Sequence, residues 1–249
     1  MPSLAHLHAL SRRFALAAVP GLLVLATLAA GPARAAGDVV VESRPVGAFQ
    51  AVAVRAPIDV VLRQSGREAV EVRAPAAALA LIQTRVVDGR FGRTLEIALT
   101  GDARLPARSP VEVTVDLSTL RALSLDGSGD VSGSQLKADE LDVTIAGSGD
   151  IVLRAIEAGT LSLSISGSGD LTVDGRAGRL TARVSGSGDI DAGGLAANEV
   201  KVRIAGSGDV EVQAAKTLDV SIAGSGDVTY RGNPTLTRSV AGSGTITRR

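Results

Sequence analysis

Several residue types that build common active sites are missing from this chain. It has no cysteine and no tryptophan, and its histidines and single methionine (His6, His8 and Met1) lie close to the N-terminus. A Ser-His-Asp triad, a Cys-His pair and the usual zinc and haem ligands are therefore excluded from the rest of the chain. The remaining chemistry there is that of paired carboxylates, a Ser-Lys pair or a hard cation such as calcium.

Aromatic residues are also scarce. After residue 35 they are Phe49, Phe91 and Tyr230. Sites for sugars and nucleobases commonly stack the ligand on aromatic faces, and this chain has few to offer. We therefore expect a protein that is not an enzyme, with a polysaccharide lyase or hydrolase on a β-helix as a disfavoured alternative.

The N-terminal segment has the pattern of an export signal. An arginine pair at 12–13 precedes an apolar run at 14–30 that is broken at Pro20, and small residues at 33–35 form a cleavage site. This order predicts a secretory signal peptide over residues 1–35. A membrane anchor is the alternative, but the run is short compared with the about 20 residues that a membrane-spanning helix needs.

Cleavage after Ala35 would leave a slightly acidic mature chain. It would keep 23 basic residues (26 minus 3) and 26 acidic residues, a net charge of −3. Such a balance gives no electrostatic footprint for nucleic acid. We expect an exported protein of the periplasm, cell envelope or extracellular space, with an envelope or surface protein or polymer as its partner. No segment of the mature chain is apolar enough to be expected to cross a membrane.

The second half of the chain repeats the tetrapeptide Gly-Ser-Gly-Asp. The copies begin at Gly127, Gly147, Gly167, Gly186, Gly206 and Gly224, and a further copy at Gly242 has Thr245 in place of the aspartate. The copies follow one another at intervals of 18–20 residues. A fixed period of this length indicates a solenoid in which one supersecondary unit is stacked repeatedly.

Apolar and polar residues alternate ahead of each tetrapeptide, as they do over 141–145. This period of two predicts a strand with one buried face. A second short strand is expected after each tetrapeptide, as at 151–153, and looser segments rich in glycine and alanine close each coil, as at 174–176 and 192–194. We predict an all-β, single-domain, right-handed parallel β-helix or solenoid with 18–20 residues per coil.

Residues 44–120 are less regular, and we interpret them as diverged opening coils of one domain over 36–249, ahead of regular repeats over 121–246. Arg121 and Arg238 interrupt apolar columns in the first and last repeats, as expected of terminal repeats. Strands are predicted at 51–54, 58–63, 69–73, 94–99 and 111–117, with a short helix or a loop at 76–82.

The repeat and two earlier segments resemble a known bacterial family. The segments are Val46-Gly47-Ala48-Phe49-Gln50-Ala51-Val52 and Ile58-Asp59-Val60-Val61-Leu62, which precede the Gly-Ser-Gly-Asp ladder. Together they resemble the family named putative auto-transporter adhesin, head GIN domain, over about residues 44–230. The resemblance implies a secreted or envelope β-helix, and it brings no catalytic residues.

The aspartates of the repeat raise an electrostatic question, because stacking would bring like charges together. At about 4.8 Å, neighbouring carboxylates repel by about 1 kcal/mol in water. A structural role would offset this repulsion if each carboxylate accepts N–H groups of the glycine turn or bonds a nearby serine. A bound calcium ion would offset it as well, and direct contact with a ligand is a third possibility. The candidate metal ligands are Asp130, Asp150, Asp170, Asp189, Asp209 and Asp227.

A mostly small and polar column is predicted on the outer face of the strands. It suits a broad, weak contact with a partner, although a solvated surface has the same composition. The column consists of Ser124, Thr144, Ser164, Arg183, Arg203, Ser221 and Ser239. The hypotheses are a binding or adhesion module, a calcium-stabilised solenoid and, least favoured, a polysaccharide-cleaving enzyme.

Overall fold

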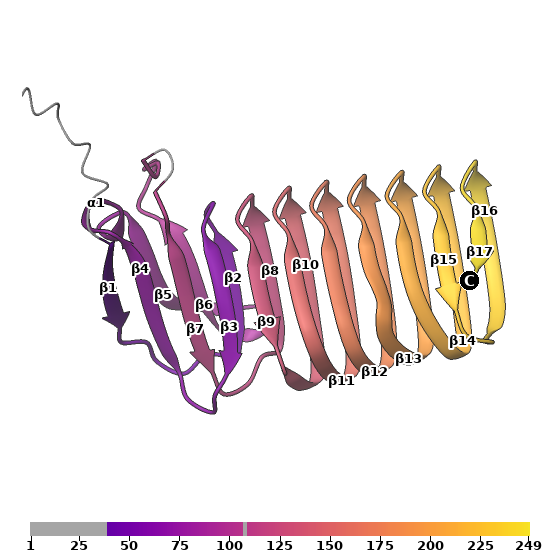
Figure 1. The fold of residues 1–249 in the computed structure, drawn as a ribbon, viewed down its shortest axis with the longest axis horizontal. Helices are drawn as coiled ribbons and strands as arrows, with labels where there is room; N and C mark the ends of the chain where they lie inside the picture. The colour runs from indigo at the N-terminus through magenta and orange to yellow at the C-terminus, as the bar shows by residue number, and fades with distance from the viewer. Residues whose placement is uncertain (1–38, 107–108) are drawn as a thin grey trace, which may run out of the picture. The chain divides into compact units, whose positions relative to one another are not determined.

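The computed structural model describes residues 39–106 and 109–249, so the predicted signal peptide lies outside the described residues. The described part is built almost entirely of strands, and 17 of them join in one continuous hydrogen-bonded sheet. Successive coils of this sheet stack along one axis (Figure 1). The predicted all-β solenoid is confirmed.

The regular coils stack in chain order with parallel strands. Each long strand pairs with the next, and the glycine turns stay in register, as the pairing of Gly147 with Gly167 and of Gly167 with Gly186 shows. These strands are β10 (Lys137–Gly147), β11 (Ile151–Gly167), β12 (Leu171–Gly186), β13 (Ile190–Gly206) and β14 (Val210–Gly224). They form the row of similar coils in Figure 1.

The prediction of loose segments that close each coil is wrong. Residues 174–176 continue β12 and pair with 194–196 of β13. The chain bends at local irregularities in register, such as the one between Leu153 and Ile156, where two residues have no partner in β12 and pairing then resumes. Each strand assigned over 15–17 residues therefore covers more than one face of a coil.

The predicted apolar columns form the core. Side chains two, four and six residues before each turn are buried through the regular coils, as Leu161, Leu163 and Ile165 are in β11. In the last coil, Arg238 pairs with Val220 of the column and is exposed. The chain ends with β15 (Val228–Arg231) and β16 (Thr235–Gly242), which both stack on β14, and with β17 (Ile246–Arg248), which stacks on β15.

The diverged coils do not stack in chain order. The coil of β2 (Ala51–Arg55) and β3 (Asp59–Gln64) pairs in parallel on one side with β8 (Ala122–Gly127) and β9 (Val131–Ser134). On its other side it pairs in parallel with β6 (Gly92–Leu99) and β7 (Glu112–Leu117). The coil of β6 and β7 comes later in the chain than the coil of β2 and β3, but it lies farther from the regular coils.

The prediction that Arg121 belongs to a terminal repeat is wrong, because the coil of β2 and β3 stacks on the repeat that contains it. Its backbone N–H donates to the carbonyl of Gln50 (2.7 Å), and its side chain is exposed. The neighbouring Leu120 is buried in its place.

Antiparallel strands cover the N-terminal side of the stack. β1 (Val39–Arg44) pairs with β4 (Ala69–Pro75), which pairs with β7, and β5 (Ile82–Gly89) forms a hairpin with β6. The helix α1 (Ala76–Leu79) confirms the helical alternative at 76–82, and β5 begins within that range. Within the described residues, no helix has the length and apolarity needed to cross a membrane.

Candidate functional site

The six predicted aspartates form one column along the solenoid. Within it, a carboxylate oxygen Oδ1 accepts the backbone N–H of the aspartate in the next coil. The N···O distance is 3.3 Å from Asp150 to Asp130, 2.9 Å from Asp170 to Asp150 and 3.0 Å from Asp189 to Asp170. It is 2.7 Å from Asp209 to Asp189 and 2.8 Å from Asp227 to Asp209. Each of these bonds places a partial positive charge between two carboxylates.

The column extends beyond the predicted aspartates at both ends. Asp59 of β3 accepts the N–H of Asp130 at 3.4 Å, so the diverged coil joins the ladder. At the other end, both the N–H and the hydroxyl of Thr245 donate to Asp227, at 2.7 and 2.8 Å. The sequence analysis did not include Asp59 among the aspartates of the column. The signal was present, because Asp59 is followed by valine just as Asp209 is.

The structural role predicted for the column is correct in kind but wrong in its partner. The N–H groups of the glycine turn donate to backbone carbonyls: those of Ser148 and Gly149 both reach the carbonyl of Gly127, at 2.9 and 3.0 Å. The N–H of the aspartate that follows the turn is the group that donates to the carboxylate of the preceding coil. Gly147 has a φ of 141°, a conformation that glycine adopts readily.

The ladder does not gather its carboxylates into a cage. In the part of the chain that the structure describes, no three His, Cys, Asp or Glu side chains converge on a point where they could hold a metal ion. Calcium usually takes 6–8 oxygen ligands, so a bound ion would need water or backbone oxygen beside neighbouring carboxylates. The ladder bonds use Oδ1 only, and Oδ2 takes no part in them. Calcium binding by these aspartates stays a prediction.

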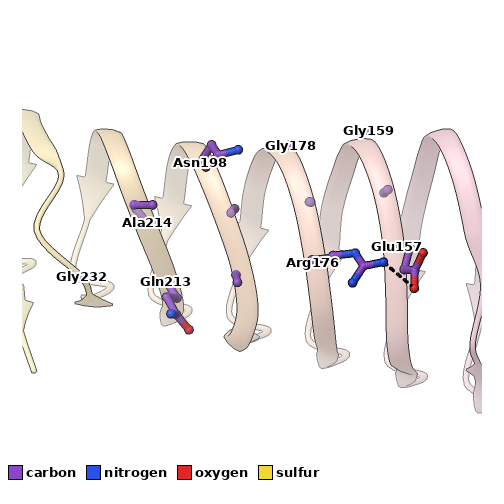
Figure 2. A pocket seen from close by; sticks show the side chains of 13 residues that line it. Glu157, Gly159, Arg176, Gly178, Asn198, Gln213, Ala214 and Gly232 are labelled. Carbon is purple, nitrogen blue, oxygen red and sulfur yellow. Dashed lines mark ion pairs between the residues drawn. The ribbon is translucent and has the colours of Figure 1, made fainter.

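A groove of about 620 Å³ crosses the coils on another face (Figure 2). Its floor is made of small residues that stack in register from β11 to β14, in a column of Ala158, Ala177, Ala197 and Ala214. Stacking also requires glycine in the lining, because a Cβ at Gly178 would lie 2.6 Å from the carbonyl oxygen of Gly159 in the preceding coil. The groove is therefore a consequence of the repeat and runs along the stack.

One end of the groove is charged and the other is uncharged. Glu157 is paired with Arg176 at 2.8 Å and with Lys137 of the preceding coil at 3.3 Å. Amide side chains, those of Asn198 and Gln213, line the part toward β14 (Figure 2). A ligand in this groove would meet an ion pair, then alanine and glycine, then amides.

The charges around Glu157 act on its ionisation. Desolvation acts to raise the pKa of this carboxyl, but the hydrogen bond to Lys137 and the positive charge of Arg176 outweigh it. The pKa of Glu157 is therefore lowered from its ordinary value of 4.5. The carboxylate stays charged at neutral pH, which keeps this end of the groove ionic.

The groove residues were missed by sequence reasoning. Their alanines recur at intervals of 17–20 residues, but they lie in the segments taken for loose closures. The predicted outer column does lie at the surface: Arg183, Arg203 and Ser221 are exposed, whereas Ser124 and Thr144 are half-buried.

Stacked coils, glycine turns and an aspartate ladder together define a β-solenoid of repeated Gly-Ser-Gly-Asp units. The chain belongs to the family described as putative auto-transporter adhesin, head GIN domain, whose model matches residues 48–234. This finding confirms the family that the sequence resembles.

Solved structures of similar fold include proteins from Bacteroides and Parabacteroides species. A putative adhesin from Bacteroides fragilis shares 26% identity over 85% of this chain and 97% of its own, with a TM-score of 0.78. A putative lipid binding protein from Parabacteroides distasonis shares 24% identity over 86% of this chain and 98% of its own (TM-score 0.69). A putative adhesin from Parabacteroides merdae shares 21% identity over 86% and 97% (TM-score 0.66). The comparison with curated proteins found no match.

Proposed function

We propose that this chain is an exported, non-enzymatic solenoid of the bacterial envelope that acts as a binding or adhesion module. The observation that carries the proposal is the groove, which runs across successive coils and so suits an extended partner lying along the stack. The family description and the names of the neighbours, adhesin and lipid binding protein, agree with a binding role.

Mutations on one strand test the groove. Ala196 and Ala205 are both exposed alanines of β13, but only Ala196 lines the groove. Ala196→Trp should fill the groove and reduce co-sedimentation of the protein with purified peptidoglycan, outer-membrane vesicles or envelope polysaccharide. Ala205→Trp is the matched control and should leave binding unchanged. Equal binding by the two variants, or no binding to any of the three fractions, would reject the groove as the site.

Export is tested separately. The full chain expressed in a bacterial host should accumulate in the envelope or outside the cell, with a processed N-terminus at Ala36. Replacing 22–26 of the apolar run with polar residues should leave the protein unprocessed in the cytoplasm. Processing at another site would correct the predicted boundary, and cytoplasmic accumulation of the unaltered chain would reject export.

A calcium-stabilised solenoid is the second candidate function. The observation in its favour is the regular spacing of carboxylates whose Oδ2 atoms take no part in the ladder bonds. Its test is the effect of calcium on thermal unfolding, which is set out in the Discussion.

A further inference from the structure

A second cavity lies where the diverged coils meet the first regular coils, away from the groove and the ladder. It has a volume of about 250 Å³, and it is lined by the tip of the β5–β6 hairpin on one side and by β2, β8 and β10 on the other. Its position shows that the hairpin tip reaches over the outer face of the sheet.

The floor of this cavity is made of unusually small outer-face residues. Along β2 and β8, Val52 and Leu123 point into the core, so their neighbours Ala51, Ala53 and Ala122 lie on the outer side. These three alanines are only 3%, 6% and 6% exposed although they face away from the core. The hairpin therefore covers them, and their small size leaves space beneath it.

Polar side chains project into the same space from adjacent strands. Ser124 pairs in register with Ala53 on β2 and with Thr144 on β10, and Asp142 accepts a hydrogen bond from the hydroxyl of Thr144 at 3.2 Å. Thr94 of β6 adds a third hydroxyl. Hydroxyls donate and accept, and a carboxylate accepts, so the cavity offers both kinds of hydrogen-bonding group.

The cavity also holds a buried charge that is already paired. Glu96 is 7% exposed in its side chain, and its Oε1 accepts hydrogen bonds from Arg55 at 3.2 Å and from Arg85 at 3.1 Å. The remaining charged groups of the lining are Asp88, Asp142 and Arg90, so acidic and basic side chains nearly balance. A balanced lining gives no strong preference for an ionic ligand.

An aromatic ring completes the wall. Phe91 lies at the hairpin tip and is half-buried, with the guanidinium of Arg90 5.1 Å from the centre of its ring. The chain has only two other aromatic residues after residue 35, and of these Phe49 is buried in the core. An aromatic face beside hydroxyls and carboxylates provides an apolar surface and fixed polar contacts in one place.

We propose that this cavity binds a single neutral sugar residue. A sugar ring presents C–H groups on its faces and hydroxyls around its edge, which matches an aromatic wall, an alanine floor and hydroxyl and carboxylate partners whose charges nearly balance with the arginines of the lining. The volume is below the about 300–1,000 Å³ of pockets for drug-sized ligands, so the cavity accommodates one ring at the end of a glycan. This site is distinct from the groove, and neither proposal depends on the other.

Saturation-transfer NMR tests the sugar site, with the methyl glycosides of glucose, galactose, mannose and N-acetylglucosamine as probes. Because aromatic residues are so few, irradiation of aromatic protons should transfer saturation to a bound sugar chiefly from Phe91. At least one glycoside should bind with a dissociation constant on the order of 1 mM. Phe91→Ala should remove the aromatic transfer and weaken binding at least about fivefold.

Two further variants separate loss of the site from loss of the fold. Ala122→Leu should fill the cavity and abolish binding, whereas Ala205→Leu, on the outer side of β13, should bind as the unaltered chain does. Thermal unfolding checks that each variant is folded; if Ala122→Leu does not fold, Phe91→Ala decides, because its side chain lies outside the core. Failure of all four glycosides to bind, or equal binding by a folded Phe91→Ala variant, would overturn the proposal.

Discussion

The regular coils and the diverged coils both stack through parallel strands, but they differ in which residues of the neighbouring coil lie against the glycine turns. In the regular part, every glycine turn lies directly on another glycine turn, and a Cβ at Gly147 would overlap the carbonyl oxygen of Gly127. At the junction with the diverged part, Gly127 of the first regular repeat lies beside Ala56, and a Cβ there would come no closer than 3.9 Å. A turn stacked on an identical turn therefore has no room for a Cβ at its first glycine, whereas the turn at the junction has room at Gly127. Gly129 of that same turn stays restricted, because a Cβ there would overlap the carbonyl oxygen of Ile58.

This difference explains where the two candidate sites lie. The groove is made by repetition, so its lining is dominated by alanine and glycine. The cavity under the β5–β6 hairpin depends on a non-repeated insertion and contains Phe91, the paired Glu96 and three hydroxyls. Chemical variety in this solenoid is concentrated where the repeat breaks down.

Substituting the two equivalent glycines should show the largest contrast. Gly127 and Gly147 have nearly the same φ, 143° and 141°, so alanine at either position costs about 1–3 kcal/mol for the strained backbone. Gly147→Ala should cost a further about 1–3 kcal/mol, because its Cβ also overlaps the backbone of the preceding coil at Gly127. Urea unfolding measures both variants, and equal losses would show that stacking does not restrict the turn.

The aspartate ladder should contribute more in the regular coils than at its junction with the diverged coils. Asp170→Ala removes the acceptor of a 3.0 Å bond from Asp189 and should cost about 1 kcal/mol. Asp59→Ala removes the acceptor of a longer bond, 3.4 Å to Asp130, and should cost less than half of that. Both are measured by the urea midpoint.

Asparagine at the same position provides the control. Asp170→Asn keeps an oxygen acceptor but removes the repulsion between this carboxylate and those of neighbouring coils. It should be neutral or slightly stabilising compared with the unaltered chain. A loss as large as that of the alanine variant would mean that the negative charge itself is needed in the column.

The ion pairs across the coils should give a smaller, pH-dependent effect. Because the pKa of Glu157 is lower in the folded chain, its contribution to stability is fully present above its ordinary value of 4.5 and is lost as the pH falls through the folded value. Lys137→Met or Arg176→Met should raise this pKa, as measured by NMR titration of the carboxyl carbon. Arg179→Met, which removes a different pair, with Glu199, should not change it. A folded-state pKa at or above 4.5 in the unaltered chain would contradict the assignment.

The regular coils could be predicted from sequence because the same pattern of apolar and polar residues recurs in every repeat. Alternation over 141–145 indicates a strand, and the fixed period places that strand on its copies. The diverged coils offer no such redundancy. Strands at 51–54 and 94–99 were recognised, but local pattern does not say which strands are neighbours, so the stacking of β2 between β6 and β8 was not foreseen.

The sites were less predictable than the fold for the same reason. The ladder was visible because its aspartates repeat, whereas Asp59 stands in a coil without the glycine turn. The glycine-rich segment at 174–176 has turn-forming composition, but its backbone continues a ladder that tertiary pairing imposes. Phe91 could be singled out as a rare residue, but only the hairpin places it over β2 and β8.

Calcium should have the smallest effect of all. Each Oδ1 of the ladder already accepts an N–H, and the described carboxylates do not converge in threes, so a strong site for an ion that takes 6–8 oxygens is not expected. After treatment with EDTA, millimolar calcium should change the melting temperature by less than about 2 °C, which corresponds to under about 1 kcal/mol for a domain of this size. Calcium at a hundred times its dissociation constant would instead add about 2.7 kcal/mol and raise the melting temperature by roughly 5–10 °C. If such a rise occurred and disappeared on substituting Asp150, Asp170 and Asp189 with asparagine, the ladder would be a metal site in the regular coils, and the contrast with the diverged coils would become one of chemistry as well as packing.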